Sequence, residues 1–203
     1  MVSRTPMGLC ILVRHGESLY NVEKRINGDP AIEVPLSDHG REEAGRLALH
    51  LAHVRIDVCV HTRFLRTIET ARLGLGDRVD SGPFVCEPLL DDINAGELEG
   101  RPIGDFSTWT AAHGPDAPFP GGGESVHDAA TRFARGYRAL AARPESVVLA
   151  VCHELPIRFA LNAAAGAVDL EWPKHRVANA DPYLFEHAAL ERAANTIERP
   201  RPG

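Results

Sequence analysis

The chain has 203 residues, of which 44% are hydrophobic and 25% are charged. This composition is typical of a soluble globular protein, and the length is enough for one α/β domain with a substantial core. Its 22 lysines and arginines stand against 28 aspartates and glutamates, which gives a formal net charge of −6. That balance argues against general binding to nucleic acid or to an anionic membrane, because both favour a net basic face. Small anions are not excluded, since they respond to a local field.

The apolar runs and the cysteines indicate a cellular compartment. No run reaches the 18 or more apolar residues of a membrane span, and the apolar part of the N-terminal segment is too short for a signal peptide. The expected location is therefore the cytoplasm. The cysteines lie inside apolar runs without CxxC or zinc-ligand spacing, which predicts four reduced core residues, Cys10, Cys59, Cys86 and Cys152.

Strand and helix patterns alternate along the chain. Short apolar runs typical of strands covered on both faces occupy residues 9–13, 57–60, 84–86 and 146–152. Apolar residues recur at helical spacing in residues 38–53, 63–75, 125–142 and 155–165. The alternation predicts an α/β fold, a three-layer sandwich in which a mostly parallel central sheet is flanked by helices.

Three segments interrupt this alternation. Residues 21–36 form a predicted loop, and residues 87–123 form a long segment rich in glycine and proline. Within the latter, aromatic side chains at 101–123 favour an ordered lid-like insertion over a flexible linker. The tail at 188–203 is expected to be frayed. With no internal repeat or domain boundary, residues 1–203 are predicted to form a single domain.

Polar residues follow the first predicted strand, where Arg14, His15, Gly16 and Glu17 come directly after residue 13. In an open α/β sheet, ligands collect at the carboxyl ends of the strands. Neighbouring strand residues point to opposite faces, so Arg14 and His15 can act together only beyond the strand, where Gly16 permits a turn. The alternative is an ordinary Arg-His pair on the surface after an edge strand.

Two other predicted strands also end in polar residues. The last one runs into His153, and the second runs into His61 and Thr62, with Arg66 in the first turn of the following helix. Because the carboxyl ends of parallel strands lie at one edge of a sheet, these side chains are expected to converge with the Arg-His pair. Such a local group of cations and imidazoles indicates a site for a small anion.

Six sequence blocks carry a resemblance to a known family. LVRHGESLYN (12–21) resembles the signature of the histidine phosphatase superfamily, the phosphoglycerate mutase-like proteins. Similar blocks follow in the family's order: PLSDHGREEA (35–44), HTRFLRTIETA (61–71), LLDDINAGELEG (89–100), GGGESVHDAATRF (121–133) and VCHELPIR (151–158). The resemblance spans about residues 9–187 and implies the phosphoglycerate mutase-like sandwich as the fold.

The resemblance also implies roles for single residues. His15 corresponds to the histidine that becomes phosphorylated, and the residues implied to hold the phosphate are Arg14, Asn21, Thr62, Arg66 and His153. Thr62 stands where a serine is usual. An imidazole attacks phosphorus best when it is neutral and its other nitrogen is held by a hydrogen bond, while fixed cations stabilise the transition-state charge. This chemistry implies no metal and no cofactor.

The leaving oxygen also needs a proton. The family places an acidic residue four positions before the glycine of a G-x-x-E-G-like block, and counting back from Gly96 gives Asp92 as the general acid and base. Many relatives have glutamate there, so this side chain is shorter. Asp91 and Glu97 are the alternatives, and a solvated turn is the non-functional interpretation.

Two residues beside the implied site depart from the family pattern. Glu154 follows His153, where relatives commonly have glycine or another small residue. It is expected either to bind the substrate through a hydrogen bond or to cap the following helix. His61 either contacts the substrate or is a spectator.

The segment after LEG (98–100) distinguishes phosphatases from mutases. The mutases carry a longer, basic insertion there that holds a second anionic group, whereas Arg101 is the only lysine or arginine from 101 to 123. We therefore predict a metal-independent phosphomonoesterase of the histidine acid phosphatase type, which hydrolyses a small phosphorylated metabolite through a phosphohistidine. Phe106, Trp109 and Phe119 either favour an apolar leaving group or pack structurally.

Three alternative functions stay open. They are a phosphoglycerate mutase-like phosphotransferase, a non-catalytic phospho-ligand binding module, and a zinc hydrolase using His15, His61 and His153, which no carboxylate or HxH spacing supports. The expected partner is a small phosphorylated substrate, with no nucleic acid and no membrane. A homodimer is left open.

Overall fold

A central sheet of five strands organises the described residues, 7–78, 82–167 and 175–199, of the computed structural model. The strand order is β3-β2-β4-β1-β5, with bounds β1 Leu9–Arg14, β2 Val58–His61, β3 Phe84–Cys86, β4 Val147–Cys152 and β5 Pro182–Glu186. The first four strands are parallel, and β5 pairs antiparallel with β1. The predicted strands agree with β1 to β4 to within one residue at each end, whereas β5 was not predicted.

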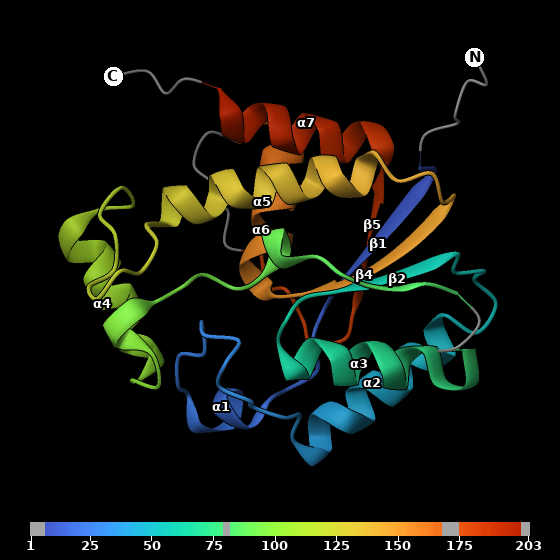
Figure 1. Ribbon diagram of the computed structural model, residues 1–203, viewed down its shortest axis with the longest axis horizontal. Coiled ribbons are helices and arrows are strands. Elements are labelled where there is room, and N and C mark those ends of the chain that lie inside the picture. Colours follow the sequence, from blue (N-terminus) through green and yellow to red (C-terminus); the bar gives the residue numbers. More distant parts are fainter. Residues whose placement is uncertain (1–6, 79–81, 168–174, 200–203) are drawn as a thin grey trace.

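Seven α-helices are present in the described ranges: α1 Leu19–Glu23, α2 Asp38–His50, α3 Leu65–Leu75, α4 Ile103–His113, α5 Val126–Ala141, α6 Glu154–Ala164 and α7 His187–Glu198. Figure 1 shows α2 and α3 on one face of the sheet and α5, α6 and α7 on the other. The helices α1 and α4 lie beyond the carboxyl ends of the strands. The predicted three-layer sandwich is confirmed.

Successive residues of β1 face different layers of the core. Cys10 and Leu12 belong to the cluster under α5, α6 and α7, while Ile11 and Val13 pack with Leu47 of α2. None of these side chains is more than 1% exposed. Both faces of the strand are therefore covered, which is why it reads as a continuous apolar run in the sequence. Each such aliphatic side chain contributes about 1.5–3 kcal/mol through burial.

Helix α5 buries the whole of its predicted apolar stripe, which consists of Val126, Ala129, Ala130, Phe133, Ala134, Tyr137, Leu140 and Ala141. The helix begins at a capping box in which the side chain of Ser125 accepts from the Asp128 amide and Asp128 Oδ2 accepts from the Ser125 amide. Such a cap stabilises a helix by about 1 kcal/mol. The Tyr137 hydroxyl donates to the carbonyl of Pro156 over 2.5 Å and links α5 to α6.

The C-terminal tail corrects one expectation. Residues 188–203 were expected to be frayed, but α7 continues to Glu198, and residues 200–203 lie outside the described residues. Leu190, Ala193, Ala194 and Ile197 are buried, and α7 packs on α5 and α6. The spacing of these four residues is i, i+3, i+4 and i+7, so the amphipathic signal is present but is carried partly by small alanines.

The cysteines correct another expectation. Cys10, Cys59 and Cys152 are buried and free, as predicted, whereas Cys86 at the end of β3 is free but exposed. Burial raises the pKa of Cys59 and of Cys152 to about 12, so these thiols stay protonated. β3 has only β2 as a neighbour in the sheet, and this edge position leaves its last side chain in solvent.

Candidate active site

The two histidines of the predicted site follow neighbouring strands. In the parallel pairing of β1 with β4, Arg14 is opposite Cys152, so His15 and His153 come next on each strand. The His15 amide donates to the Cys152 carbonyl over 3.0 Å, and the two imidazole centroids are 5.4 Å apart. The expected meeting of two strand-end histidines is therefore realised.

A tight turn after β1 fixes the backbone of His15. A Cβ atom on Gly16 would lie 2.4 Å from the carbonyl oxygen of Gly40 in α2, so only glycine fits. The Gly16 amide donates to Thr70 Oγ1 of α3 over 2.9 Å, and Asn179 Nδ2 donates to the His15 carbonyl over 2.7 Å. Contacts from three distant segments thus position this turn.

The hydrogen bonds of His15 determine its tautomer. Nδ1 is 2.7 Å from the Gly16 carbonyl oxygen, which can only accept, so Nδ1 carries the proton. Nε2 then holds a lone pair, and it accepts from Arg66 Nε over 3.0 Å. Burial, with the positive charges of Arg66 and Arg14, holds the pKa of His15 well below its ordinary value. The imidazole is therefore neutral, with its lone pair available to an electrophile.

Arg66, in the first turn of α3, is the centre of the cluster and is only 3% exposed. Its Nη2 donates to Asp92 Oδ2 over 3.2 Å and lies 3.1 Å from His153 Nδ1. Asn27 accepts from the same guanidinium through its backbone carbonyl at 3.0 Å and through its side-chain oxygen. Burial lowers the pKa of Arg66 to about 10, so it remains a cation at neutral pH.

Thr62 lies behind His153, and neither residue is among those that line the pocket. The implied phosphate contact of Thr62 stays a prediction. It is completely buried, and its Oγ1 is 3.0 Å from His153 Nε2 and 2.9 Å from Thr67 Oγ1. Because Arg66 donates to His153 Nδ1, the proton of this neutral ring is on Nε2 and is shared with Thr62. Burial, with the charge of Arg66, holds the pKa of His153 well below its ordinary value.

Asp92 is the one carboxylate of the three weighed that lines the pocket. Its Oδ2 is 3.5 Å from His153 Nδ1, and burial raises its pKa although Arg66 opposes the shift. Asp91 instead pairs with Arg63 at 2.5 Å and is not among the residues that line the pocket, and Glu97 is exposed. The geometry therefore favours Asp92 as a proton donor to a group bound at the two histidines.

Arg14 and Glu154 form an ion pair at the pocket. Arg14 Nη1 is 3.0 Å from Glu154 Oε2 and donates to the Val177 carbonyl over 2.8 Å. Arg14 Nε is buried and finds no hydrogen-bond acceptor within the described residues. Glu154 is the first residue of α6, so its carboxylate lies in the first turn, where a negative charge stabilises the helix N-terminus. This placement fits the predicted role at the start of the helix, and a hydrogen bond from Glu154 to the substrate stays a prediction.

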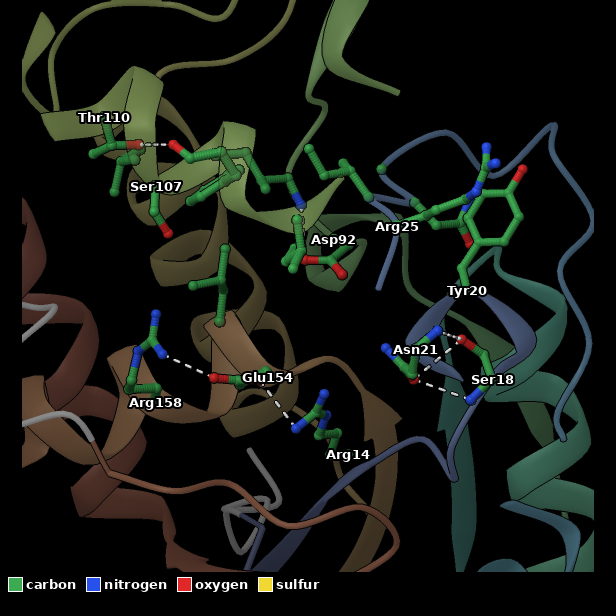
Figure 2. Close-up of a pocket in the computed structure, with 18 of the residues that line it drawn as sticks. Arg14, Ser18, Tyr20, Asn21, Arg25, Asp92, Ser107, Thr110, Glu154 and Arg158 are labelled. Carbon is green, nitrogen blue, oxygen red and sulfur yellow. Dashed lines mark hydrogen bonds and ion pairs between the residues drawn. The ribbon is translucent and has the colours of Figure 1, made fainter. Parts of the chain in front are cut away.

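Asn21 on α1 presents its amide to the pocket. Its Oδ1 accepts from the amide of Ser18 over 3.0 Å, so its Nδ2 is the atom on the open side, as Figure 2 shows. A donor is the group that an anionic oxygen requires. The arrangement is compatible with the implied phosphate contact of Asn21.

A cavity of about 950 Å³ opens in front of these groups (Figure 2). Beyond the site residues, its lining includes Ile26, Ile93, Ile103, Phe106, Ser107, Thr110, Leu155 and Arg158. Of the three aromatic residues of 101–123, only Phe106 lines the cavity. Trp109 stacks on His113 with centroids 3.8 Å apart, and Phe119 is buried 4.8 Å from Phe106. Packing therefore explains two of the three rings.

Two site residues were missed at the level of sequence. Asn27 binds Arg66, and Glu99 binds the Asn27 loop: its carboxylate accepts from Asn27 Nδ2 at 3.2 Å and from the amides of Gly28 and Asp29 at 2.6 and 3.1 Å. Glu99 belongs to the LEG motif and Asn27 precedes a glycine in the 21–36 loop. Both residues could be seen in the sequence, but they lie in segments far apart in the chain, so no local pattern predicts that they contact each other.

His61 is placed outside the pocket. Its Nδ1 is 2.7 Å from the Thr62 carbonyl oxygen, and its ring packs on Phe84 with centroids 4.4 Å apart. Of the two interpretations, the structure supports a spectator. In the described ranges, no group of three or more His, Cys, Asp or Glu is arranged to hold a metal ion. No described helix has the length and hydropathy to cross a membrane.

The family follows from the fold, the site and a match to a family model. The model of the histidine phosphatase superfamily (branch 1) matches residues 10–198, so the chain belongs to this superfamily and the resemblance is confirmed. Membership places it among enzymes of phosphoryl transfer, which include phosphatases and phosphotransferases.

Individual relatives come from both groups. The chain is 32% identical to the fructose-2,6-bisphosphatase TIGAR B of Danio rerio, over 60% of this chain and only 49% of that protein. It is 26% identical to a 2,3-bisphosphoglycerate-dependent phosphoglycerate mutase of Gloeobacter violaceus, over 95% of this chain and 98% of the mutase. Among solved structures, the alpha-ribazole phosphatase of Shigella flexneri superposes with a TM-score of 0.75 at 25% identity, over 87% of this chain and 89% of that one.

Proposed function

We propose that this protein is a metal-independent phosphomonoesterase that hydrolyses a small phosphorylated metabolite through a phosphohistidine on His15. The observation that carries the proposal is the neutral His15 imidazole, whose Nε2 lone pair lies beside Arg66 and faces a cavity lined by Asp92. The positive charge that a phosphoryl group requires comes from Arg14 and Arg66. No step therefore calls for a metal or a cofactor.

The first step transfers the phosphoryl group to the protein. Nε2 of His15 forms the bond to phosphorus as the bond to the ester oxygen breaks, and the leaving oxygen takes the proton of Asp92. Arg66 must exchange its hydrogen bond to His15 Nε2 for bonds to phosphoryl oxygens. Arg14 Nε, which has no acceptor among the described residues, supplies one further donor. The products are the free alcohol, phosphohistidine and ionised Asp92.

The second step returns the protein to its starting state. Water attacks phosphorus, its proton passes to the Asp92 carboxylate, and the bond between phosphorus and His15 Nε2 breaks to release phosphate. Because burial raises the pKa of Asp92, its carboxyl keeps the proton to a higher pH than an ordinary aspartate does, which supports an acid phosphatase type of activity. The net charge of −6 argues against a nucleic acid or membrane partner and leaves a small phosphorylated substrate as the expected one.

A phosphoglycerate mutase-like phosphotransferase is the second candidate. It is favoured by the match to the Gloeobacter mutase, which covers nearly the whole of both chains. Against it, Arg101 is the only lysine or arginine in residues 101–123, and it pairs with Asp105 at 2.8 Å. The α4 wall of the cavity thus offers no cation to hold a distal anionic group while an intermediate reorients.

A trapping experiment decides between these functions. The protein is incubated with 4-nitrophenyl phosphate in the presence of a chelator and quenched in alkali, and the acid-labile phosphoprotein is measured for wild type and His15→Ala. A hydrolase forms an adduct that water discharges, and the adduct is absent in His15→Ala. Transfer of the phosphoryl group to phosphoglycerate would establish the mutase instead. A stable adduct would indicate a binding module, and turnover abolished by the chelator would indicate a metal enzyme.

A further inference from the structure

Glu154 joins two arginines on the floor of the cavity. Its Oε2 is 3.0 Å from Arg14 Nη1, and its Oε1 is 2.8 Å from Arg158 Nη1, one helical turn further along α6. Figure 2 shows the three side chains in a row, with Arg14 on β1 at one end and Arg158 extending toward the α4 side of the cavity. The row therefore runs from the proposed phosphate position to the space left for the leaving group.

The row contains one cation more than the phosphate position needs. The side chain of Arg158 is only 15% exposed, and its buried Nε has no hydrogen-bond acceptor in the described parts of the chain. An arginine in this position is the group that a carboxylate or a second phosphate of a substrate would seek. In this chain, Glu154 already occupies it.

The charges then balance for one phosphate group. Arg14, Arg66 and Arg158 bring three positive charges and Glu154 removes one, so two remain for a phosphate dianion when Asp92 is protonated. Arg25, the other cation of the lining, is half exposed and pairs with Glu23 at 3.0 Å, and such surface pairs contribute little. Among the described residues of the lining, a second anionic group would meet the Glu154 carboxylate and no unpaired arginine to offset it.

We propose that Glu154 is a specificity-determining residue that restricts the site to phosphate monoesters whose leaving group carries no negative charge. The proposal rests on the proposed function, because it assumes that the phosphoryl group lies at His15. The accepted leaving groups are neutral or cationic alcohols, and the excluded ones carry a carboxylate or a second phosphate.

Binding to a protein that cannot turn over the ligand tests this selectivity directly. Dissociation constants of glycerol 3-phosphate and 3-phosphoglycerate, which differ chiefly by a hydroxymethyl group against a carboxylate, are measured by calorimetry on His15→Ala. We expect glycerol 3-phosphate to bind about tenfold more tightly. In His15→Ala/Glu154→Gln the preference should shrink to within about threefold, through tighter binding of phosphoglycerate, since Arg158 is then free to pair. His15→Gln replaces His15→Ala if the latter does not fold.

Two further variants sharpen the test. Glu42→Gln, on α2 and 71% exposed, removes the same charge away from the cavity and should leave the preference unchanged. Adding Arg158→Met to the Glu154→Gln protein should abolish the gain for phosphoglycerate. The proposal is overturned if adding Glu154→Gln changes the ratio of the two dissociation constants by less than about twofold relative to His15→Ala. It is also overturned if adding Glu42→Gln changes this ratio as much as Glu154→Gln does. Turnover of 4-nitrophenyl phosphate by the wild type is scored separately and decides the proposed function alone.

Discussion

Arg66 donates a hydrogen bond from Nε to Nε2 of His15 over 3.0 Å, so the arginine binds the lone pair that the proposed mechanism uses. Burial, assisted by the charge of this guanidinium, lowers the pKa of His15 and keeps the imidazole neutral, and the guanidinium also lies where phosphoryl oxygens must bind. In the free protein the imidazole is therefore neutral, but its Nε2 lone pair already accepts the hydrogen bond from Arg66. Substrate binding has to move the arginine donors from the histidine to the phosphate.

Replacing Arg66 should separate these two effects. In Arg66→Gln the pKa of His15 is expected to rise, because a positive charge that lowers it is lost. The rate of phosphoryl transfer should fall by about 10²–10³-fold, as for loss of a preorganised transition-state donor. Arg66→Lys keeps the charge, so it should keep the low pKa while losing most of the rate. Titration of the imidazole signals by NMR and single-turnover kinetics measure the two quantities. An unchanged His15 pKa in Arg66→Gln would contradict the assignment.

Asp92→Asn should impair catalysis according to the leaving group. With glycerol 3-phosphate, whose alkoxide needs a proton, kcat should fall by about 10²–10⁴-fold, whereas 4-nitrophenyl phosphate should lose much less. In the wild type, kcat for the alkyl ester should decline as pH rises through the raised pKa of Asp92. Glu97→Gln, which changes an exposed carboxylate close by in the chain, serves as the control. A loss with the alkyl ester of less than about threefold would exclude Asp92 as the acid.

Glu99 is expected to be a positioning residue: its hydrogen bonds reach Arg66 through Asn27, and its negative charge also acts on the guanidinium and raises the pKa of Arg66. Glu99→Ala removes acceptors from the amides of Gly28 and Asp29, so the loop that holds the guanidinium should loosen. A misplacement of this kind lowers kcat by about 10–100-fold. Glu99→Gln keeps one acceptor oxygen and should recover part of the rate. If both variants lose the same amount of kcat and the pKa of His15 does not change, Glu99 acts on folding and not on the position of Arg66. A lowered melting temperature in both variants would then accompany the loss.

Stability should fall in acid because His15 and His153 are buried as neutral rings. Their folded pKa values lie well below 6.5, the value near which both titrate once unfolded, so the unfolded state binds more protons below that pH. Each ring then costs up to about 1.4 kcal/mol of unfolding free energy per pH unit as pH falls below about 6.5. Asp92, whose pKa is raised in the folded protein, contributes to the free energy of unfolding with the opposite sign, so its contribution increases as pH falls.

Urea unfolding between about pH 7 and pH 5 measures this dependence, and His153→Gln isolates one of the rings. The variant should be less stable than the wild type at neutral pH, yet its free energy of unfolding should decline less steeply in acid. Because Asp92 is present in both proteins, the difference between their slopes reports mainly on His153. Parallel slopes would show that His153 is not held neutral by burial.

The elements that the sequence predicted well are those with a strong periodic pattern. Helix α5 carries large apolar residues over more than four turns, and the boundaries of β1 to β4 follow from continuous apolar runs. Helix α4 escaped prediction because none of its residues is fully buried, so no stripe exists. β5 begins with a proline and lies at the sheet edge, where burial is incomplete and the apolar pattern is weak.

The sequence by itself determined the family, the convergence of the chemistry-bearing strand ends at one edge of the sheet, and the residue types of the site. Local patterns suffice for this, because a strand end and a motif are contiguous in the chain. Only the tertiary structure decided which atoms meet: that Thr62 lies behind His153, that Glu99 holds Asn27, and that Glu154 joins Arg14 to Arg158. All three arrangements link segments far apart in sequence, and the last also depends on how α6 faces the end of β1. Side-chain hydrogen bonds extend only about 3 Å, so they exist only once packing has placed both partners.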